Sequence, residues 1–182
     1  MKYAAAALML AIAGTAQAEV VSSAPGGFEV RSVKVVKGTP EQVWTTIAKI
    51  GDWWDPAHSY SGKAANLSLS LETGACFCEA IPAGTQAGNG GATAAAGMVI
   101  HGRVLMAMPY QTVTLDSALG PILDEGATGR LKWTLKPVAG GTEVTQSYVV
   151  GGYIRGGGDK LAPIVDMVLG QALTRLQAHL AR

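Results

Sequence analysis

The sequence is short of charge, of cysteine and of long apolar runs. Charged residues make up 15% of its 182 positions, with 14 Lys and Arg against 13 Asp and Glu. Proteins that bind nucleic acids or anionic membranes usually carry an excess of clustered Lys and Arg. This near-neutral chain has no basic run, so we expect no nucleic-acid partner. The two cysteines are too few for a disulfide framework or a four-cysteine metal site. A core built by a chain of this length needs neither.

The N-terminus has the layout of a cleavable secretory signal. Lys2 is followed by an uncharged apolar run over residues 4–13, and an A-x-A pattern ends at Ala18. The run is too short to cross a bilayer, which takes about 20 residues, and no later stretch is long enough. We therefore predict a signal peptide over 1–18, a periplasmic or secreted protein, and no stable membrane insertion after cleavage. Residues 19–27 read as a flexible leader.

Hydrophobic periodicity predicts the fold. Thr39 and Pro40 are suited to cap and begin a helix, and residues 159–182 carry apolar side chains at spacings of three and four. Alternating patterns predict strands over 28–37, 67–71, 75–81, 98–108, 113–119, 130–136 and 144–150. The alternation slips near Ser32, which predicts a bulge there. The order predicts an α+β domain over 28–182, in which a curved antiparallel sheet of about seven strands wraps around the long C-terminal helix.

Several segments resemble the helix-grip superfamily, also called SRPBCC. They are GTPEQVW at 38–44, WWDP at 53–56, ETG at 72–74 and GRLKWTL at 129–135, followed by the terminal helix. The superfamily includes START lipid-transfer domains, polyketide cyclases and pollen allergens. The resemblance covers nearly all of the predicted domain and implies a cavity between the sheet and the last helix. The same fold hosts binding, transport and catalysis, so the resemblance does not choose among them.

Residues expected to line that cavity lie on inward strand positions or in loops at its edges. They are Trp54, Met98, Met106, Trp133, Gln146, Tyr148 and Tyr153. Aromatic and methionine side chains suit an apolar pocket, and an amide such as that of Gln146 can orient a ligand's polar group. Tyr153 lies in the glycine-rich segment 151–158, which we expect to form a lid opposite Trp54. The alternative is that these side chains simply fill a core.

The segment 53–62 is a predicted loop rich in aromatic residues, and two of its residues are candidates for acid–base chemistry. A histidine can act as an acid or a base, His58 has Tyr60 as a close neighbour, and Asp55 is placed to orient the imidazole. The alternative is a loop histidine that bonds to backbone. Strand parity places His101 on the outward face, so we expect no role for it. The sequence has no G-x-S-x-G or H-E-x-x-H motif, and we expect neither a metal nor a cofactor.

Cys76 and Cys78 flank Phe77 in a predicted strand, where alternate Cα atoms lie roughly 6.6 Å apart. That separation is at the upper limit for a disulfide. The pair is either two reduced side chains on one strand face, or a disulfide or redox pair suited to an oxidising compartment. Metal binding lacks the further ligands that it would need.

These patterns predict an exported binding or carrier protein for a hydrophobic small molecule, such as a lipid, an isoprenoid or a polyketide-like compound. The alternative is an enzyme of cyclase, dehydratase or hydrolase type that uses the same cavity with His58 and Tyr60.

Overall fold

The computed structural model describes residues 19–85 and 95–182, so the predicted signal peptide lies outside the described residues. The strands are β1 (Glu19–Ala24), β2 (Gly27–Val36), β3 (Leu67–Leu69), β4 (Cys76–Ile81), β5 (Gly97–Met108), β6 (Thr112–Ser117), β7 (Gly126–Val138) and β8 (Gly141–Tyr153). The α-helices are α1 (Pro40–Ala48) and α2 (Gly158–Leu180). Four 3₁₀ helices complete the described elements: η1 (Ile50–Asp52), η2 (Pro56–His58), η3 (Ala64–Asn66) and η4 (Gly120–Asp124).

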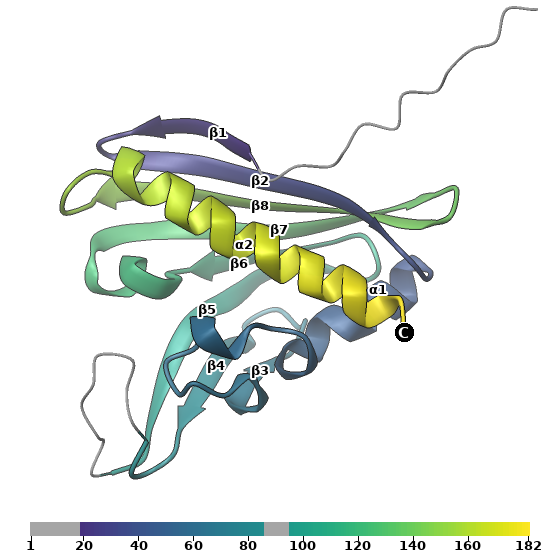
Figure 1. Cartoon of the computed structure of the whole chain (residues 1–182), viewed down its shortest axis with the longest axis horizontal. Coiled ribbons are helices and arrows are strands. Elements are labelled where there is room, and N and C mark those ends of the chain that lie inside the picture. Colours follow the sequence, from purple (N-terminus) through teal and green to yellow (C-terminus); the bar gives the residue numbers. More distant parts are fainter. Residues whose placement is uncertain (1–18, 86–94) are drawn as a thin grey trace, which may run out of the picture.

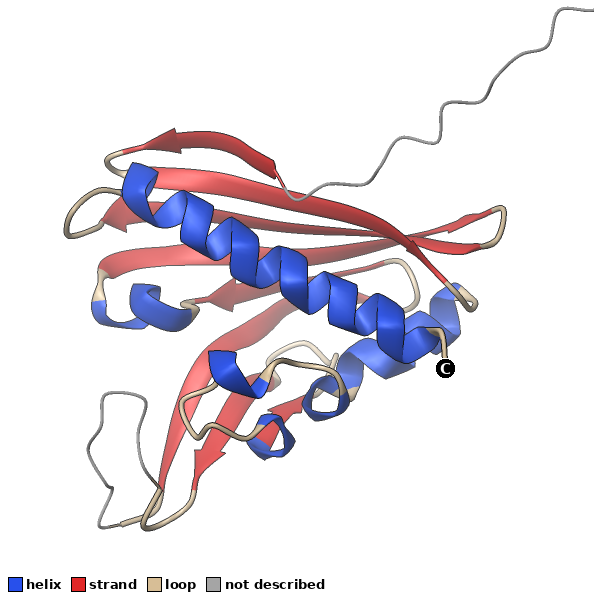
Figure 2. Cartoon of the chain, in the orientation of Figure 1, coloured by secondary structure: helices blue, strands red, loops and turns tan. Residues whose placement is uncertain are grey.

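The strands form one antiparallel sheet in the order β1-β2-β8-β7-β6-β5-β4-β3. The long helix α2 runs across one face of this sheet, in front of β2, β8 and β7 (Figures 1 and 2). Helix α1 and the short helices η1, η2 and η3 gather at the β3 side, whereas η4 lies beside β7. The α+β fold predicted from the sequence, with a long C-terminal helix packed against an antiparallel sheet, is confirmed.

Helix α1 begins as the sequence predicts. The Thr39 side chain accepts a hydrogen bond from the Gln42 N–H, and the Gln42 side chain accepts one from the Thr39 N–H, which together form a capping box. Pro40 occupies the first turn, where its missing N–H costs nothing. Val43 and Ile47 are fully buried on the inner side of the helix.

Helix α2 buries a stripe of apolar side chains against the sheet. Its buried apolar members are Ala162, Val165, Leu169, Ala172, Leu173 and Leu176. Each fully buried leucine stabilises the fold by about 1.5–3 kcal/mol relative to an exposed one. Among the described helices, none combines the length and the hydropathy needed to cross a membrane.

The N-terminal segment differs from the expected flexible leader. Residues 19–24 form β1, which pairs with β2 and brings the sheet to eight strands rather than about seven. The turn after β1 is tied to the start of α2, because the Gly158 N–H donates to the Pro25 carbonyl at 2.9 Å. A Cβ on Gly158 would lie 2.8 Å from the Ala24 carbonyl oxygen, so a glycine is required at this close approach.

The bulge predicted near Ser32 is absent. Strand β2 pairs with β8 in unbroken register from Gly27 opposite Gly151 to Val36 opposite Thr142. Ser32 faces inward and is 4% exposed, whereas Val35 lies on the outer face. Ser32 is a small polar residue on the buried face, so it interrupts the hydrophobic alternation of a strand whose pairing is regular.

Strand β5 contains two irregularities that the sequence did not predict. His101 has no partner between the pairs Phe77–Gly102 and Cys78–Ile100, and a second register shift falls between Val104 and Met106. Each added residue reverses the face to which the following side chains point. His101 is therefore buried, and the expectation that it faces outward is wrong.

Candidate functional site

A cavity of about 380 Å³ lies between α2, the loop 53–62 and η4. Its lining is mainly aliphatic and aromatic: Trp54, Ala57, Leu67, Phe77, Leu119, Pro121, Ile164, Val165, Met167, Val168 and Leu169, together with His58, Ser59, Tyr60, His101 and Gly120. Ile164 and Met167 are about half exposed, at 52% and 51%, which places the mouth of the cavity along α2. The volume is within the range typical of small-molecule sites.

The loop that forms one wall is held to the two α-helices. The Trp53 indole N–H donates to the Thr46 carbonyl at 2.8 Å. Arg175 of α2 donates to the Trp53 carbonyl at 3.1 Å and forms an ion pair with Asp55 at 3.6 Å. Asp55 also caps η2 by accepting from the Ala57 N–H. Asp55 thus orders the loop, and its carbonyl accepts the His58 backbone N–H at 3.0 Å. Among the described residues, no hydrogen bond joins the Asp55 side chain to the His58 ring.

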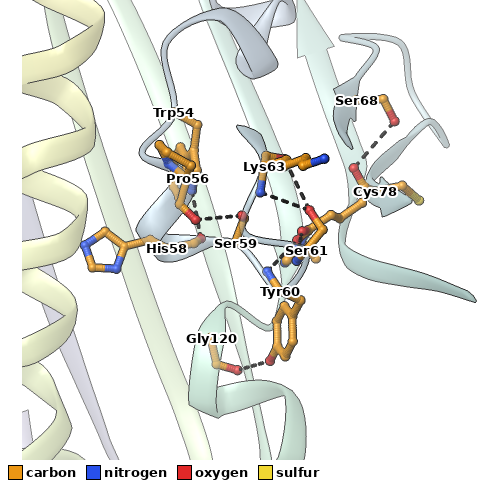
Figure 3. A network of polar contacts seen from close by, with 12 residues as sticks. Trp54, Pro56, His58, Ser59, Tyr60, Ser61, Lys63, Ser68, Cys78 and Gly120 are labelled. Atoms are coloured by element: carbon orange, nitrogen blue, oxygen red, sulfur yellow. Dashed lines mark hydrogen bonds and ion pairs between the residues drawn. The ribbon is translucent and has the colours of Figure 1, made fainter. Parts of the chain in front are cut away.

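Trp54, His58 and Tyr60, all predicted as site residues, do line the cavity. The Trp54 indole N–H donates to the His58 carbonyl at 3.0 Å, and the Tyr60 hydroxyl donates to the Gly120 carbonyl at 3.0 Å. In Figure 3 the His58 ring and the Tyr60 ring point in different directions from the loop. The two therefore share the cavity without forming a hydrogen-bonded acid–base pair.

The tyrosine is also poorly suited to act as a base. Burial raises the pKa of the Tyr60 hydroxyl, and the nearby carboxylates of Asp124 and Glu79 raise it further. Its proton is committed to the Gly120 carbonyl, which joins the loop to η4 (Figure 3). Tyr60 thus acts as a structural wall of the site.

The polar centre of the site is a pair that the sequence did not predict, Glu79 of β4 and His101 of β5. Glu79 is fully buried and accepts hydrogen bonds from the backbone N–H groups of Tyr60 and Ser61. Its Oε2 lies 3.0 Å from Nε2 of His101. One carboxylate therefore fastens the loop 53–62 to the sheet and also holds the histidine.

Both groups have perturbed pKa values. Burial alone would raise the pKa of the Glu79 carboxyl, but hydrogen bonds from Ser61, Tyr60 and His101 outweigh it and the pKa is lowered. Burial lowers the pKa of His101, and the neighbouring carboxylate only partly opposes this. At neutral pH the pair is thus a carboxylate with a neutral imidazole. Because a carboxylate only accepts, Nε2 carries the proton and Nδ1 is left as an acceptor.

The bulge explains both why His101 reaches the site and why the sequence hid it. The backbone carbonyl of His101 accepts hydrogen bonds from the Ala118 N–H at 3.0 Å and from the Ser117 hydroxyl at 2.9 Å. The carbonyl of the bulged residue is therefore hydrogen-bonded although His101 has no partner residue in β4. A Cβ on Gly102 would lie 2.6 Å from the Asp116 carbonyl oxygen. Two sequence signals were available. Gly102 lies inside a strand, where a glycine often marks a bulge, and Glu79 is an acidic residue in the otherwise apolar strand CFCEAI, where burial requires a polar partner.

Three other predicted ligand-binding residues lie in the core rather than at the cavity. Trp133 and Tyr148 are fully buried and Gln146 is 2% exposed. The Trp133 indole N–H donates to the Gln146 side chain at 2.8 Å, and Gln146 donates to the Leu169 carbonyl at 2.9 Å. The Tyr148 hydroxyl donates to the Ser117 carbonyl at 3.1 Å. Every polar group of this cluster is paired within the protein, so none is offered to the cavity.

The remaining predicted ligand-binding residues are on the surface. Met98 is 69% exposed and Met106 39% exposed, because the two bulges of β5 reverse their faces. Tyr153 is 73% exposed beside a separate hollow formed with Gly156 and Gly157. Trp54 is not among the residues that line this hollow, so the two do not face each other across one opening.

Cys76 and Cys78 form a disulfide across Phe77, with their Cα atoms 5.4 Å apart. Between the two cysteines, Phe77 faces the cavity and packs against Trp54 and His101. The bridge therefore spans the strand segment that presents this ring. Within the described ranges 19–85 and 95–182, no cluster of potential ligands could hold a metal ion.

The geometry of the sheet and its long helix is shared with many solved structures. No protein-family model matches the chain, and no curated protein matches it significantly. A protein from Rhodobacter sphaeroides is 19% identical with a TM-score of 0.57, and the alignment covers 91% of this chain and 99% of that one. A protein from Rhizobium leguminosarum is 15% identical with a TM-score of 0.58, over 88% of this chain and 97% of that one.

A third match is DynU16, described as a protein of the dynemicin biosynthetic locus. It is 17% identical with a TM-score of 0.55, and the alignment covers 84% of this chain and 47% of DynU16. Identities this low show a common fold alone. The chain has a fold that resembles helix-grip proteins, and its function must be argued from its own cavity.

Proposed function

We propose that this protein is an exported binding or carrier protein for a hydrophobic small molecule held in the cavity between α2 and the loop 53–62. The observation that carries the proposal is the cavity itself, about 380 Å³ in volume and lined mainly by apolar side chains. Burial of apolar ligand surface against such a lining stabilises a complex by about 25 cal/mol per Å². The aliphatic residues of α2 would contact one side of the ligand, and Trp54 and Phe77 the other.

Binding is tested with N-phenyl-1-naphthylamine, a neutral fluorescent probe. Val168→Trp should fill the cavity and weaken binding at least about tenfold, because Val168 lines it from α2. Gln171→Trp adds the same side chain at an exposed position of the same helix and should leave binding unchanged. The proposal fails if both variants bind the probe as the parent does. It also fails if only Met98→Ser, at an exposed position of β5, abolishes the signal.

Export is supported by the signal-like segment 1–18 and by the Cys76–Cys78 disulfide, which suits an oxidising compartment. N-terminal sequencing of the secreted protein should begin at Glu19, the first residue of β1. A mature protein that retains Met1 would contradict export by this route.

The alternative, an enzyme that uses His58 and Tyr60, has less support. The Tyr60 hydroxyl is committed to Gly120, and no described contact joins it to His58. The carboxylate–imidazole pair of Glu79 and His101 is better arranged for proton transfer, since a held imidazole with a free nitrogen is the arrangement of a general base. Mass spectrometry of small molecules retained by protein purified from its own periplasm separates carrier from enzyme by showing an unchanged or a converted compound.

A further inference from the structure

We infer that His101, held by Glu79, is the polar contact of the cavity and selects apolar ligands that carry a neutral hydroxyl donor, such as a phenol. The inference rests on the proposed function, because it names the class of molecule that the same cavity takes. It begins from a buried group that the fold alone does not explain.

Glu79 has a structural role without the histidine. Its two oxygens accept the backbone N–H groups of Tyr60 and Ser61, which fastens the loop 53–62 to β4. The third partner of Glu79 is His101, and an apolar side chain in its place would still let Glu79 fasten the loop. The histidine instead occupies a strand bulge, which puts a polar ring on the inner side of the sheet. Burying a polar side chain costs free energy unless all its groups find partners.

His101 has a partner for only one of its two ring nitrogens. Nε2 bonds to Glu79 at 3.0 Å, and among residues 19–85 and 95–182 no group bonds to Nδ1. Three side-chain polar atoms in that part of the chain are fully enclosed without a partner, and Nδ1 of His101 is not one of them. The His101 side chain as a whole is 7% exposed. Because His101 lines the cavity, this remaining access is from the cavity side.

Two aromatic rings pack against the imidazole at tilted angles. Phe77 lies 4.9 Å away between ring centroids and Tyr60 lies 5.8 Å away, with interplanar angles of 37° and 39°. These neighbours limit the room for a ligand to stack on the imidazole, and Nδ1 is the ring atom left for a polar contact. An edge contact to an acceptor nitrogen is a directional hydrogen bond, and the ligand must supply the proton.

The charge at the site sets the chemical class of that donor. An anionic headgroup, such as the carboxylate of a fatty acid, would bring a negative charge toward an acceptor nitrogen backed by the buried Glu79 carboxylate. A neutral hydroxyl on a flat apolar body carries no negative charge, so neither the acceptor nitrogen nor the Glu79 carboxylate repels it. The lining around His101, including Leu67, Leu119 and Val165, then takes the apolar body.

The test compares two probes of nearly the same shape, 2-naphthol and 2-methoxynaphthalene, by isothermal titration calorimetry. The parent protein should prefer 2-naphthol about tenfold, the worth of one buried hydrogen bond. His101→Phe keeps an aromatic ring and should reduce the preference below about twofold while it still binds 2-methoxynaphthalene. Gln171→Phe adds the same ring at an exposed position of α2, outside the lining, and should keep the preference.

The outcomes separate the two proposals. Equal binding of both probes by the parent protein overturns this inference and leaves the proposed function standing. A preference that survives His101→Phe, or that disappears in Gln171→Phe, does the same. Binding of neither probe overturns the proposed function and this inference with it. If His101→Phe does not fold, ¹⁵N NMR of the parent protein decides. The Nδ1 resonance of His101 should move with 2-naphthol and not with 2-methoxynaphthalene, and an unmoved resonance overturns the inference.

Discussion

The inner face of the sheet is covered in two different ways. Under α2, the strands β2, β7 and β8 form a filled half in which Trp133, Gln146 and Tyr148 are buried and hydrogen-bonded to the protein. Toward β3, β4 and the bulged part of β5 lies a cavity half, where α2 and the loop 53–62 enclose open volume. Large aromatic side chains occur in both halves, so their presence does not distinguish a core from a site.

Polar pairing is what distinguishes the halves. In the filled half, Gln146 joins Trp133 to the Leu169 carbonyl, and both partners are satisfied. In the cavity half, Glu79 is satisfied but His101 retains an unpaired nitrogen. A site is therefore better recognised by an incomplete hydrogen-bond inventory beside a cavity than by aromatic content.

The largest expected effect is in the filled half. Trp133→Ala removes a fully buried ring and leaves Gln146 without a donor, so the free energy of unfolding should fall by about 3–5 kcal/mol. Lys132→Ala, at an exposed position of the same strand, is the control and should change it little. Urea unfolding followed by far-UV circular dichroism measures both. A loss below about 1 kcal/mol for Trp133→Ala would show that this half is not closely packed.

The next effect concerns the buried pair and depends on pH. Glu79→Gln removes the charge that accepts the Tyr60 and Ser61 N–H groups, and should cost about 2–3 kcal/mol at pH 7. The pKa of Glu79 lies below its ordinary value of 4.5 in the folded protein, so the carboxylate's contribution is complete above that value. It is lost as the pH falls through the lowered pKa. The stability difference between parent and variant should therefore shrink as the pH falls below 4.5.

His101 adds to this acid sensitivity in the same direction. Its folded pKa lies below the ordinary 6.5, so the unfolded chain takes up a proton first and stability falls as the pH drops below 6.5. Unfolding free energies of parent and Glu79→Gln from pH 7 to pH 3 measure both trends. Glu72→Gln, at an exposed position, should match the parent at pH 7. A parent–Glu79→Gln gap that stays constant over the whole range would contradict the account.

Gln146→Leu sharpens the comparison between the halves. It leaves the Trp133 indole N–H and the Leu169 carbonyl without their partner, so it should cost about 1–3 kcal/mol. Affinity for N-phenyl-1-naphthylamine, corrected for the folded fraction, should stay unchanged. Weaker probe binding at full folding would return Gln146 to the ligand site that the sequence had predicted.

The smallest effect is expected at the disulfide. Cys76 and Cys78 are only two positions apart, so the bridge constrains little of the unfolded chain. The double variant Cys76→Ser/Cys78→Ser should lose about 1–2 kcal/mol. The parent protein measured with and without dithiothreitol provides the matched comparison, and a reduced parent as stable as the oxidised one would show that the bridge does not stabilise β4.

The elements whose pattern is regular could be predicted from the sequence. The capping residues Thr39 and Pro40 and the apolar spacing of α2 predicted both helices to within a few residues. Trp54, His58 and Tyr60 were recognised because an aromatic loop follows the first helix. Local pattern was sufficient in each case.

The residues that were misplaced needed information beyond local pattern. Met98, Met106 and His101 depend on two register shifts in β5, and a bulge is set by the partner strands rather than by alternation. Trp133 and Tyr148 have the inward parity that was expected, but parity cannot tell whether α2 covers a position or leaves a cavity beside it.

The central claim is that ligands enter the cavity half and leave the filled half unchanged, and two indole N–H groups report on it directly. Trp54 lines the cavity, and Trp133 is sealed in the filled half with its N–H on Gln146. In ¹H–¹⁵N NMR spectra recorded during titration with 2-naphthol, the Trp54 indole resonance should move progressively while that of Trp133 stays in place. A moving Trp133 resonance with an unmoved Trp54 would contradict the account.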